Sequence, residues 1–331
     1  MNKPKIGLAL SGGGVRGLAH IGVLQLLEES KISIAYLAGT SMGGIIAGLY
    51  AAGISAPELR ERGLHTNILE LLRPAPHHYG LLGHQKIREF LIKLLGSADI
   101  TFSDLQIPVT VMATDVETGE LIALNNGPLI PALLATSSFP FVFGPVRHCD
   151  RWLVDGGILN NYPIDIVRQM GAERVIGVDT PPSIQLAVPG EADFPRLSLK
   201  ALIDRKINLV DWKTPFLIAE SSAISMMSLI NQQRAELSPP DFQLSISLPG
   251  IGTFMPGKNK EIIDAGYAVA RNHRAQLRAQ LEQPVLAASL RRGLNFVRRL
   301  RRAWNAYHEP LYSPFPPIRE LPAPPQVTPP S

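Results

Sequence analysis

Short apolar runs alternate with glycine-containing turns and amphipathic stretches at the start of the chain. Residues 5–10 are mostly apolar, which predicts a buried strand, and residues 18–29 carry apolar side chains at helical spacing. The same order repeats at residues 34–38 and 44–52, where Gly53 is placed to end the second helix. A strand–helix–strand–helix order predicts parallel strands covered by helices, and therefore a three-layer α/β/α sandwich.

The later pattern adds strands and one helical insertion to this framework. Residues 57–104 have mainly helical periodicity, which predicts a helical cap inserted into the sandwich. Residues 32–57 carry no charge and are long enough to span a membrane, but their glycines, serines and threonines favour a buried strand and helix. The other expected elements are strands at 108–114, 120–125, 152–154, 174–179 and 242–248, and helices at 130–136, 164–170, 214–235 and 261–281.

The chain changes character after Pro284. We therefore expect a folded domain at residues 1–283, a basic amphipathic helix at 284–309 and a proline-rich, disordered tail at 310–331. The tail has nine prolines in 22 positions, which prevents a packed core. The apolar positions of the basic helix fall near one face: Leu286, Leu290, Leu294, Val297, Leu300 and Trp304.

Composition and charge narrow the functional classes. The chain is 45% hydrophobic and 18% charged, which is typical of a folded protein, and its single cysteine excludes a disulfide framework. The net charge is +4, yet residues 271–302 hold nine arginines against one acid, so the remainder is mildly acidic. This favours an anionic membrane surface as the partner of residues 286–304 and disfavours nucleic acid; the alternative is a helix that packs its leucine face on the domain. The N-terminus lacks a secretion signal pattern, so we expect a cytoplasmic protein attached peripherally to the inner face of the membrane.

A glycine loop follows the first strand and opens the first helix. Residues 12–17 fit G-x-G-x-x-G, a dinucleotide-binding pattern, but the next strand ends without the acid that would hold a ribose. No Lys-Ser/Thr follows the loop either, which excludes a P-loop. The remaining chemical use of such a loop is to present free N–H groups to a developing oxyanion; the structural alternative is a simple tight turn.

The second turn has the features of a nucleophile elbow. Gly39, Ser41 and Gly43 form the one G-x-S-x-G pattern of the chain, between a predicted strand and a predicted helix. The serine of such a turn adopts strained backbone angles that project its hydroxyl outward, and the flanking positions must be small. Ser41 is therefore predicted to be a nucleophile.

A nucleophilic serine needs a base, and two candidates stand out. Seven of the eight histidines fall in predicted helices, the cap or the tail, which leaves His148 as a candidate. Asp155 is better placed, because it ends a predicted strand and is followed by two glycines. Burial would raise its pKa, and a direct hydrogen bond to Ser41 would allow proton transfer. The alternative for Asp-Gly-Gly is an ordinary turn.

Together these motifs resemble the patatin-like phospholipase family, and the bacterial branch in particular. The resemblance is carried by residues 12–17 (GGGVRG), 39–43 (GTSMG), 135–140 (ATSSFP) and 155–163 (DGGILNNYP), supported by 113–119 (ATDVETG). It covers residues 5–180 strongly and is expected to extend to about residue 281.

The resemblance implies a function and a set of site residues. It implies a serine acyl hydrolase of the esterase, lysophospholipase or phospholipase A type, with a Ser41–Asp155 dyad, an acyl-enzyme and no metal or cofactor. Gly12, Gly13 and Gly14 match the oxyanion loop, with Gly13 and Gly14 as the expected donors, and Arg16 matches a basic position that either contacts an anionic headgroup or forms a structural ion pair. The expected substrates are phospholipids, lysophospholipids or other acyl esters.

Two further hypotheses stay open at this point. The alternative function is a non-catalytic lipid-binding or regulatory module of the same fold. An acyl-chain pocket could be formed by residues that are equally typical of a core: Phe90, Leu91, Leu94, Leu95, Met226, Met227 and Met255.

Overall fold

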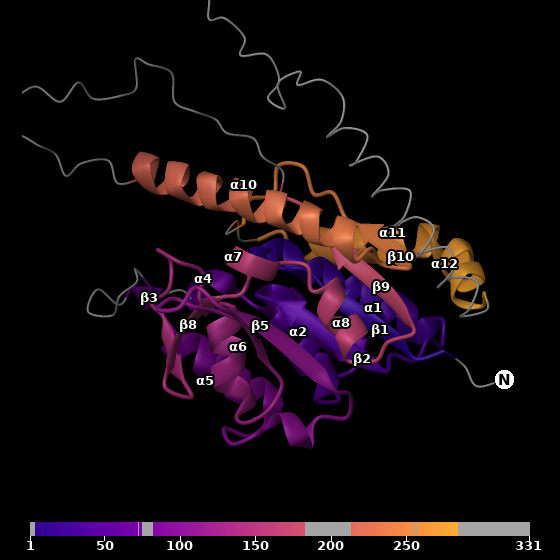
Figure 1. Cartoon of the computed structure of the whole chain (residues 1–331), viewed down its shortest axis with the longest axis horizontal. Coiled ribbons are helices and arrows are strands. Elements are labelled where there is room, and N and C mark those ends of the chain that lie inside the picture. The colour runs from indigo at the N-terminus through magenta and orange to yellow at the C-terminus, as the bar shows by residue number, and fades with distance from the viewer. Residues whose placement is uncertain are drawn as a thin grey trace, which may run out of the picture. The chain divides into compact units, whose positions relative to one another are not determined.

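The computed structural model describes residues 4–71, 73–74, 82–182, 213–253, 255 and 257–283 (Figure 1). All of them belong to one compact unit. The basic helix and the proline-rich tail predicted at 284–309 and 310–331 lie outside the described residues, so their boundaries and the anionic membrane contact of residues 286–304 stay predictions.

The described strands form one main sheet in the order β10-β9-β1-β2-β5-β8-β7, with β6 also paired to β5. Five strands are parallel: β1 (Ile6–Leu10), β2 (Tyr36–Thr40), β5 (Val109–Asp115), β9 (Arg174–Asp179) and β10 (Phe242–Ser245). Three are antiparallel to their neighbours: β6 (Leu121–Leu124), β7 (Val146–His148) and β8 (Arg151–Asp155). A small separate pair is formed by β3 (Arg73–Pro74) and β4 (Leu82–Gly83).

The sheet is mixed, because tight turns return the chain beside β5 and between β7 and β8. Cys149 and Asp150 adopt φ values of 48° and 60° and join β7 to β8 as a two-residue hairpin. Left-handed angles at both central residues define the type I′ turn, which matches the twist of antiparallel strands. The sequence pattern did not predict β7, which has only three residues.

Helices cover both faces of the sheet. The described helices are α1 (Ala19–Glu29), α2 (Met42–Ala51), α3 (Ala56–His65), α4 (Ile68–Leu71), α5 (Gln85–Leu95), α6 (Leu129–Thr136), α7 (Gly157–Asn160), α8 (Ile164–Gln169), α10 (Lys213–Leu237), α11 (Asn259–Asn272) and α12 (Arg274–Leu281). Short 3₁₀ turns occupy Gly14–Leu18 and Phe102–Asp104. The inserted helical segment comprises α3, α4 and α5. The helix predicted at 261–281 is divided at His273, whose Nδ1 lies 2.9 Å from the carbonyl oxygen of Val269.

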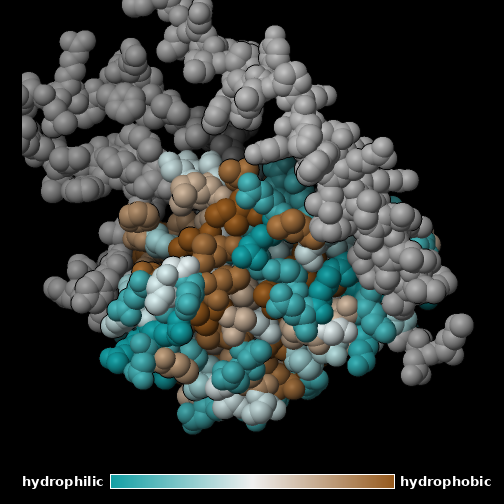
Figure 2. Space-filling view, in the orientation of Figure 1, coloured by the Kyte–Doolittle hydropathy of each residue, from teal (hydrophilic) through white to brown (hydrophobic). Residues whose placement is uncertain are grey.

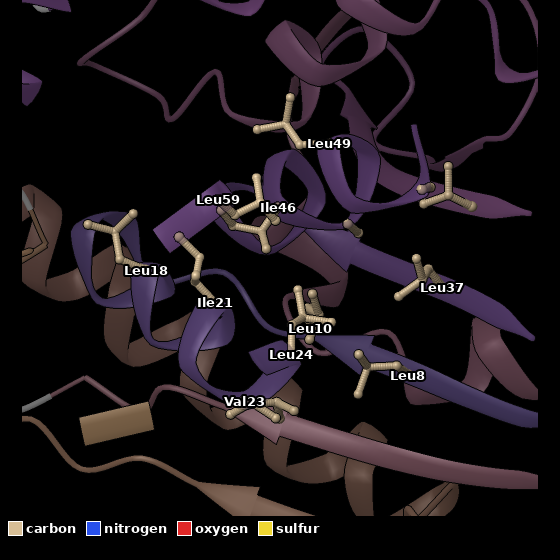
Figure 3. Close-up of a cluster of buried hydrophobic side chains, with 14 of the residues drawn as sticks. Leu8, Leu10, Leu18, Ile21, Val23, Leu24, Leu37, Ile46, Leu49 and Leu59 are labelled. Carbon is tan, nitrogen blue, oxygen red and sulfur yellow. The ribbon is translucent and has the colours of Figure 1, made fainter. Parts of the chain in front are cut away.

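Alternate strand residues face opposite helical layers, as the two-residue period of a strand requires. Leu8, Leu10 and Leu37 contribute to the larger core, which packs on α1 and α2 (Figure 3). Ala9 and Ala38 belong to a second cluster on the other face, beside α8. The fold is therefore a three-layer α/β/α sandwich. Among the described helices, none combines the length and the apolarity needed to cross a bilayer.

Candidate active site

Ser41 lies on a strained turn between β2 and α2. Its φ of 55° and ψ of −128° fall in a region that side chains rarely adopt, and the residue is partly exposed. A methyl group on Gly39 would clash with the carbonyl of Gly43, and one on Gly43 would clash with the carbonyls of Leu10 and Ser11. The turn therefore needs glycine at both flanking positions, as predicted for a nucleophile elbow.

The turn is fixed by a buried threonine of the 135–140 motif. The N–H of Ser41 donates to Thr136 Oγ1 at 3.0 Å, and Thr136 Oγ1 donates to the carbonyl of Met112 at 2.5 Å. Met112 is the residue of β5 that pairs with Thr40 at the end of β2. The backbone at Ser41 is thus tied to the neighbouring strand, which supports its strained angles.

The register of the sheet brings Asp155 next to this turn. Residues 109–112 of β5 pair with β2, and residues 113–115 pair with β8, so that Ala113 faces Asp155. β6 pairs with residues 111–114 of β5, a range that overlaps both the β2 pairing and the β8 pairing. β6 must therefore lie along one edge of β5, and β2 and β8 must follow each other along the other edge. Asp155 therefore continues the line of β2 just where β2 turns into Ser41.

The Asp155 carboxyl is fully buried and only partly hydrogen-bonded. Its Oδ1 accepts a hydrogen bond from the N–H of Gly157 at 2.8 Å, while Oδ2 has no partner of standard hydrogen-bond geometry. Burial raises the pKa of Asp155 to about 7, against the opposing effects of hydrogen bonding from the Ser41 side chain and from Gly157. The N–H of Asp155 donates to the carbonyl of Ser138 at 2.9 Å, which fixes the backbone here. A carboxyl with this pKa can accept and return a proton near neutral pH.

The glycine loop after β1 lies against Ser41. A methyl group on Gly12 would be 3.0 Å from Ser41 Cβ, which shows how closely the two turns approach. The N–H of Gly12 donates to the carbonyl of Asn161 at 3.0 Å, so it is not free to donate to a ligand. Of the three glycines expected to form the oxyanion hole, Gly13 and Gly14 remain as candidate donors. Within the described part of the chain, the N–H groups of Gly13 and Gly14 make no hydrogen bond. Gly14 has a φ of +58°, where glycine is strongly preferred.

Buried polar residues that the sequence did not single out support the loop. Ser11 Oγ accepts a hydrogen bond from the N–H of Thr180 at 3.0 Å, and Thr180 Oγ1 donates to the carbonyl of Gly12 at 3.3 Å. His20 Nε2 lies 2.7 Å from the carbonyl of Ser11. Burial lowers the pKa of His20 to about 4, so the ring is neutral at pH 7 and Nε2 must carry the proton that it donates.

The side chain of Arg16 is buried. It is 4% exposed, and its Nη1 donates to the carbonyl of Ile251 at 3.4 Å. Its charge also counteracts the effect of burial, which raises the pKa of Asp179 at the end of β9. Its burial and its effect on Asp179 favour a structural role, and the headgroup contact of Arg16 stays a prediction.

His148 is too far from Ser41 to act as its base. It pairs with Arg151 at the start of β8, whereas Asp155 ends the same strand. Four residue steps along a strand place the two about 13 Å apart. Burial lowers the pKa of the His148 side chain.

Helix α10 reaches the site across α7. The methyl carbon of Met227 lies 2.6 Å from the position that a side chain on Gly157 would take. The N–H of Asn161 donates to Asn231 Oδ1 at 3.0 Å, and Arg234 forms an ion pair with Asp165 at 2.9 Å. No sequence signal predicts these contacts, because they join segments some 70 residues apart.

The residues considered for an acyl pocket are dispersed. Leu91, Leu94 and Leu95 pack on the main core, as ordinary core residues do. Met227 packs with a small cluster formed by Phe139, Val142 and Phe143 beside the site, whereas Met226 and Met255 are exposed. In the part of the chain that the structure describes, no group of three or more His, Cys, Asp and Glu side chains is arranged to bind a metal ion.

Comparisons with known proteins match this site to one family. Residues 8–168 match the model of the family described as patatin-like phospholipase. An uncharacterized NTE family protein of Mycobacterium tuberculosis (strain ATCC 25618 / H37Rv) is 36% identical over 183 residues, which cover 54% of this chain and 49% of that protein. The patatin-like phospholipase domain-containing protein 6 of Homo sapiens is 30% identical over 283 residues, 79% of this chain and 20% of that protein.

A solved structure has the same fold at low sequence identity. The crystal structure of VipD from Legionella pneumophila aligns with a TM-score of 0.52 and 14% identity, over 82% of this chain and 66% of that chain. The chain spans about half the length of the Mycobacterium tuberculosis relative and about a fifth of the human relative.

Proposed function

Because the chain belongs to the patatin-like phospholipase family, we propose that it is a lipid acyl hydrolase with a Ser41–Asp155 dyad. One observation carries the proposal: a fully buried carboxyl with a pKa of about 7 lies beside a strained, partly exposed serine. General-base catalysis is most effective when the pKa of the base is near the working pH. The proposed dyad therefore uses Asp155, and no histidine, as the base.

The proposed reaction is acyl transfer in two steps. Ser41 Oγ attacks the ester carbonyl while its proton passes to the Asp155 carboxylate. The tetrahedral intermediate expels the alcohol, which takes the proton from Asp155 and leaves an acyl group on Ser41. Water then attacks the acyl-enzyme with Asp155 again as base, and the fatty acid leaves.

The negative charge of the intermediate would be stabilised by the glycine loop. The N–H groups of Gly13 and Gly14 carry no other hydrogen bond in the described residues and lie at the start of a helical segment beside Ser41. Removing one such donor in an acyl-transfer enzyme costs about 10²–10³ in kcat. The N-terminus of α2, which Ser41 caps, adds a favourable field for negative charge.

The substrates that this family membership favours are carboxylic esters of lipids: phospholipids, lysophospholipids or other acyl esters. The mechanism assigns every chemical step to residues of this chain, so we propose that it needs no metal or cofactor. A cytoplasmic location with peripheral attachment to the inner membrane face, and a contact of residues 286–304 with anionic lipid, also stay proposals.

The first experiment measures hydrolysis of a short p-nitrophenyl ester and of a lysophospholipid, with EDTA present. We expect the wild type to be active and Ser41→Ala and Asp155→Asn to fall to background. If Ser41→Ala alone is inactive, Asp155 is not the base. If the wild type hydrolyses neither ester, including lipid presented in vesicles, the non-catalytic lipid-binding alternative is favoured. Activity that EDTA abolishes would contradict the metal-independent mechanism.

A further inference from the structure

Large apolar side chains are exposed around the candidate active site. Four such residues are Val116, Phe141, Met226 and Met255, which are 51%, 60%, 65% and 39% exposed. We name this set the apolar rim. Apolar side chains at the surface of a soluble protein are ordinary when scattered, but their gathering around one site indicates an interaction surface.

Two members of the apolar rim lie on segments that are hydrogen-bonded to β8, the strand that ends at Asp155. Val116 directly follows β5, which is separated from β1 and the glycine loop by β2 alone. The N–H of Val116 donates to the carbonyl of Trp152 in β8. Phe141 lies three residues after Ser138, whose carbonyl accepts the N–H of Asp155.

The other two members approach from α10 and from the loop before α11. Met226 precedes Met227, whose methyl carbon contacts the region of Gly157. Met255 lies two residues after Thr253, whose carbonyl accepts the N–H of Val15 in the glycine loop. Every member is thus within a few residues of a group that touches the dyad or the loop. Figure 2 shows hydrophobic residues gathered across the middle of the face on which α10 and α7 lie.

Phe141 is exposed at a backbone conformation that costs the fold energy. Its φ is 68°, where a bulky aromatic residue is an outlier. Its neighbours Phe139, Val142 and Phe143 are buried in the cluster with Met227, so this loop has already placed its other large apolar side chains inside. Packing does not explain why a fourth apolar residue is held outward under strain, and a docking function does.

The charged residues near the apolar rim indicate which kind of partner it can bind. Three of the four segments that carry the apolar rim contain no charged residue over long stretches, at 136–146, 221–233 and 242–257. A nucleic acid or an acidic peptide would be met by basic residues here. The fourth segment is acidic, because Val116 lies between Asp115 and Glu117. Three uncharged segments and one acidic segment around a proposed acyl hydrolase site fit a neutral lipid surface better than an anionic partner.

We propose that the apolar rim docks the active site onto a lipid–water interface, and that zwitterionic lipid suffices for this docking. The inference rests on the proposed lipid acyl hydrolase function and assigns the surface through which the substrate arrives. It is independent of the basic segment 286–304, which would instead require anionic lipid and weaken with salt.

Vesicle binding of the full chain tests the proposal. Flotation with pure phosphatidylcholine vesicles, at low and at high salt, compares the wild type with a double variant, Phe141→Asn with Met226→Gln. Asparagine tolerates the positive φ at position 141, so the variant keeps the local backbone. The matched control is Leu237→Gln, since Leu237 is 73% exposed on the same helix but lies about 16 Å further along it.

We expect wild type and Leu237→Gln to bind at both salt concentrations and the double variant to partition at least tenfold more weakly. Hydrolysis of a soluble short ester by the same samples reports on the proposed function separately, and the loss of vesicle binding should exceed any change in that rate. Equal binding by wild type and the double variant, equal loss in Leu237→Gln, or binding that needs anionic lipid and disappears at high salt would each overturn the proposal. A wild-type dimer that the double variant abolishes, without vesicle binding, would assign the apolar rim to a second copy of the chain.

Discussion

Replacing Asp155 by asparagine should abolish catalysis and stabilise the protein at neutral to basic pH. Asparagine has nearly the same shape as aspartate, can accept the hydrogen bond from Gly157 N–H, and never ionises. The wild-type carboxyl must ionise inside the protein, where Oδ2 has no partner of standard geometry. The ionised Asp155 carboxylate, which the proposed mechanism requires, therefore destabilises the folded state.

The magnitude follows from the pKa of about 7 in the folded protein, against 3.8 for an unperturbed aspartate. Because the folded state holds the Asp155 proton more tightly than the unfolded state does, the contribution of Asp155 to the free energy of unfolding falls as pH rises from about 4 to about 7. Above pH 7 this contribution is constant. At about 1.4 kcal/mol per pH unit, ionisation of Asp155 costs at most about 4 kcal/mol above pH 7 and about 2 kcal/mol at pH 5. The advantage of Asp155→Asn should therefore grow by about 2 kcal/mol between pH 5 and pH 8.

Thermal unfolding at pH 5, 6, 7 and 8 measures this advantage. A change of 1 kcal/mol moves Tm by about 2–4 °C in a domain of 150–250 residues, so the pH-dependent part should be about 4–8 °C. The control is Asp150→Asn, because the Asp150 side chain is 94% exposed and its φ of 60° suits asparagine. A Tm difference for Asp155→Asn that is absent at pH 8, or equal at all four pH values, would refute the assignment of a buried, raised-pKa carboxyl.

The same ionisation should govern the rate. With Asp155 as base, kcat/KM for a soluble ester should rise about tenfold per pH unit below pH 7 and level off above it. The profile of His148→Gln should have the same midpoint, since His148 lies at the other end of β8. A midpoint that moves in His148→Gln, or a flat profile from pH 5 to 8, would contradict the assignment.

Two further substitutions test the glycine loop. Gly14→Ala should lower kcat by about 10²–10³ without unfolding the protein, because a side chain at this φ would clash with Thr253 and displace the loop. Gly96→Ala is the control: Gly96 also has a positive φ but has open space around it, so kcat should be unchanged. Arg16→Gln should lower activity on a charged phospholipid and on an uncharged ester by the same factor, since Arg16 is buried against Ile251; a loss confined to the phospholipid would restore the headgroup role.

The fold and the dyad candidates could be predicted because their signals are local. The elbow at Ser41 is specified by glycines two residues away on either side, and the structure has the strand, turn and helix in that order. Strand and helix periodicity likewise located β9 at Arg174–Asp179 and α6 at Leu129–Thr136 within one residue. Each signal spans fewer than a dozen residues, which is the range over which periodicity and turn chemistry act.

The remaining features could not be predicted because they depend on contacts between distant segments. Nothing local to Gly12 indicates that its N–H is taken by Asn161, which lies 149 positions away. The burial of Arg16 depends on Ile251, and the contact of Met227 with Gly157 depends on the path of α10. Periodicity gives the buried face of an element, but it does not give the partner that covers this face.

The burial that raises the pKa of Asp155 is itself supplied by several segments. The register of β5 aligns Asp155 with the end of β2, Ser138 fixes its backbone, and Met227 of α10 packs over the adjacent Gly157. A carboxyl in the same Asp-Gly-Gly turn but open to water would keep its ordinary pKa and would be a poor base for a serine hydroxyl. The basicity of Asp155 is therefore a property of the assembled layers, and the Asp-Gly-Gly motif alone is insufficient to produce it.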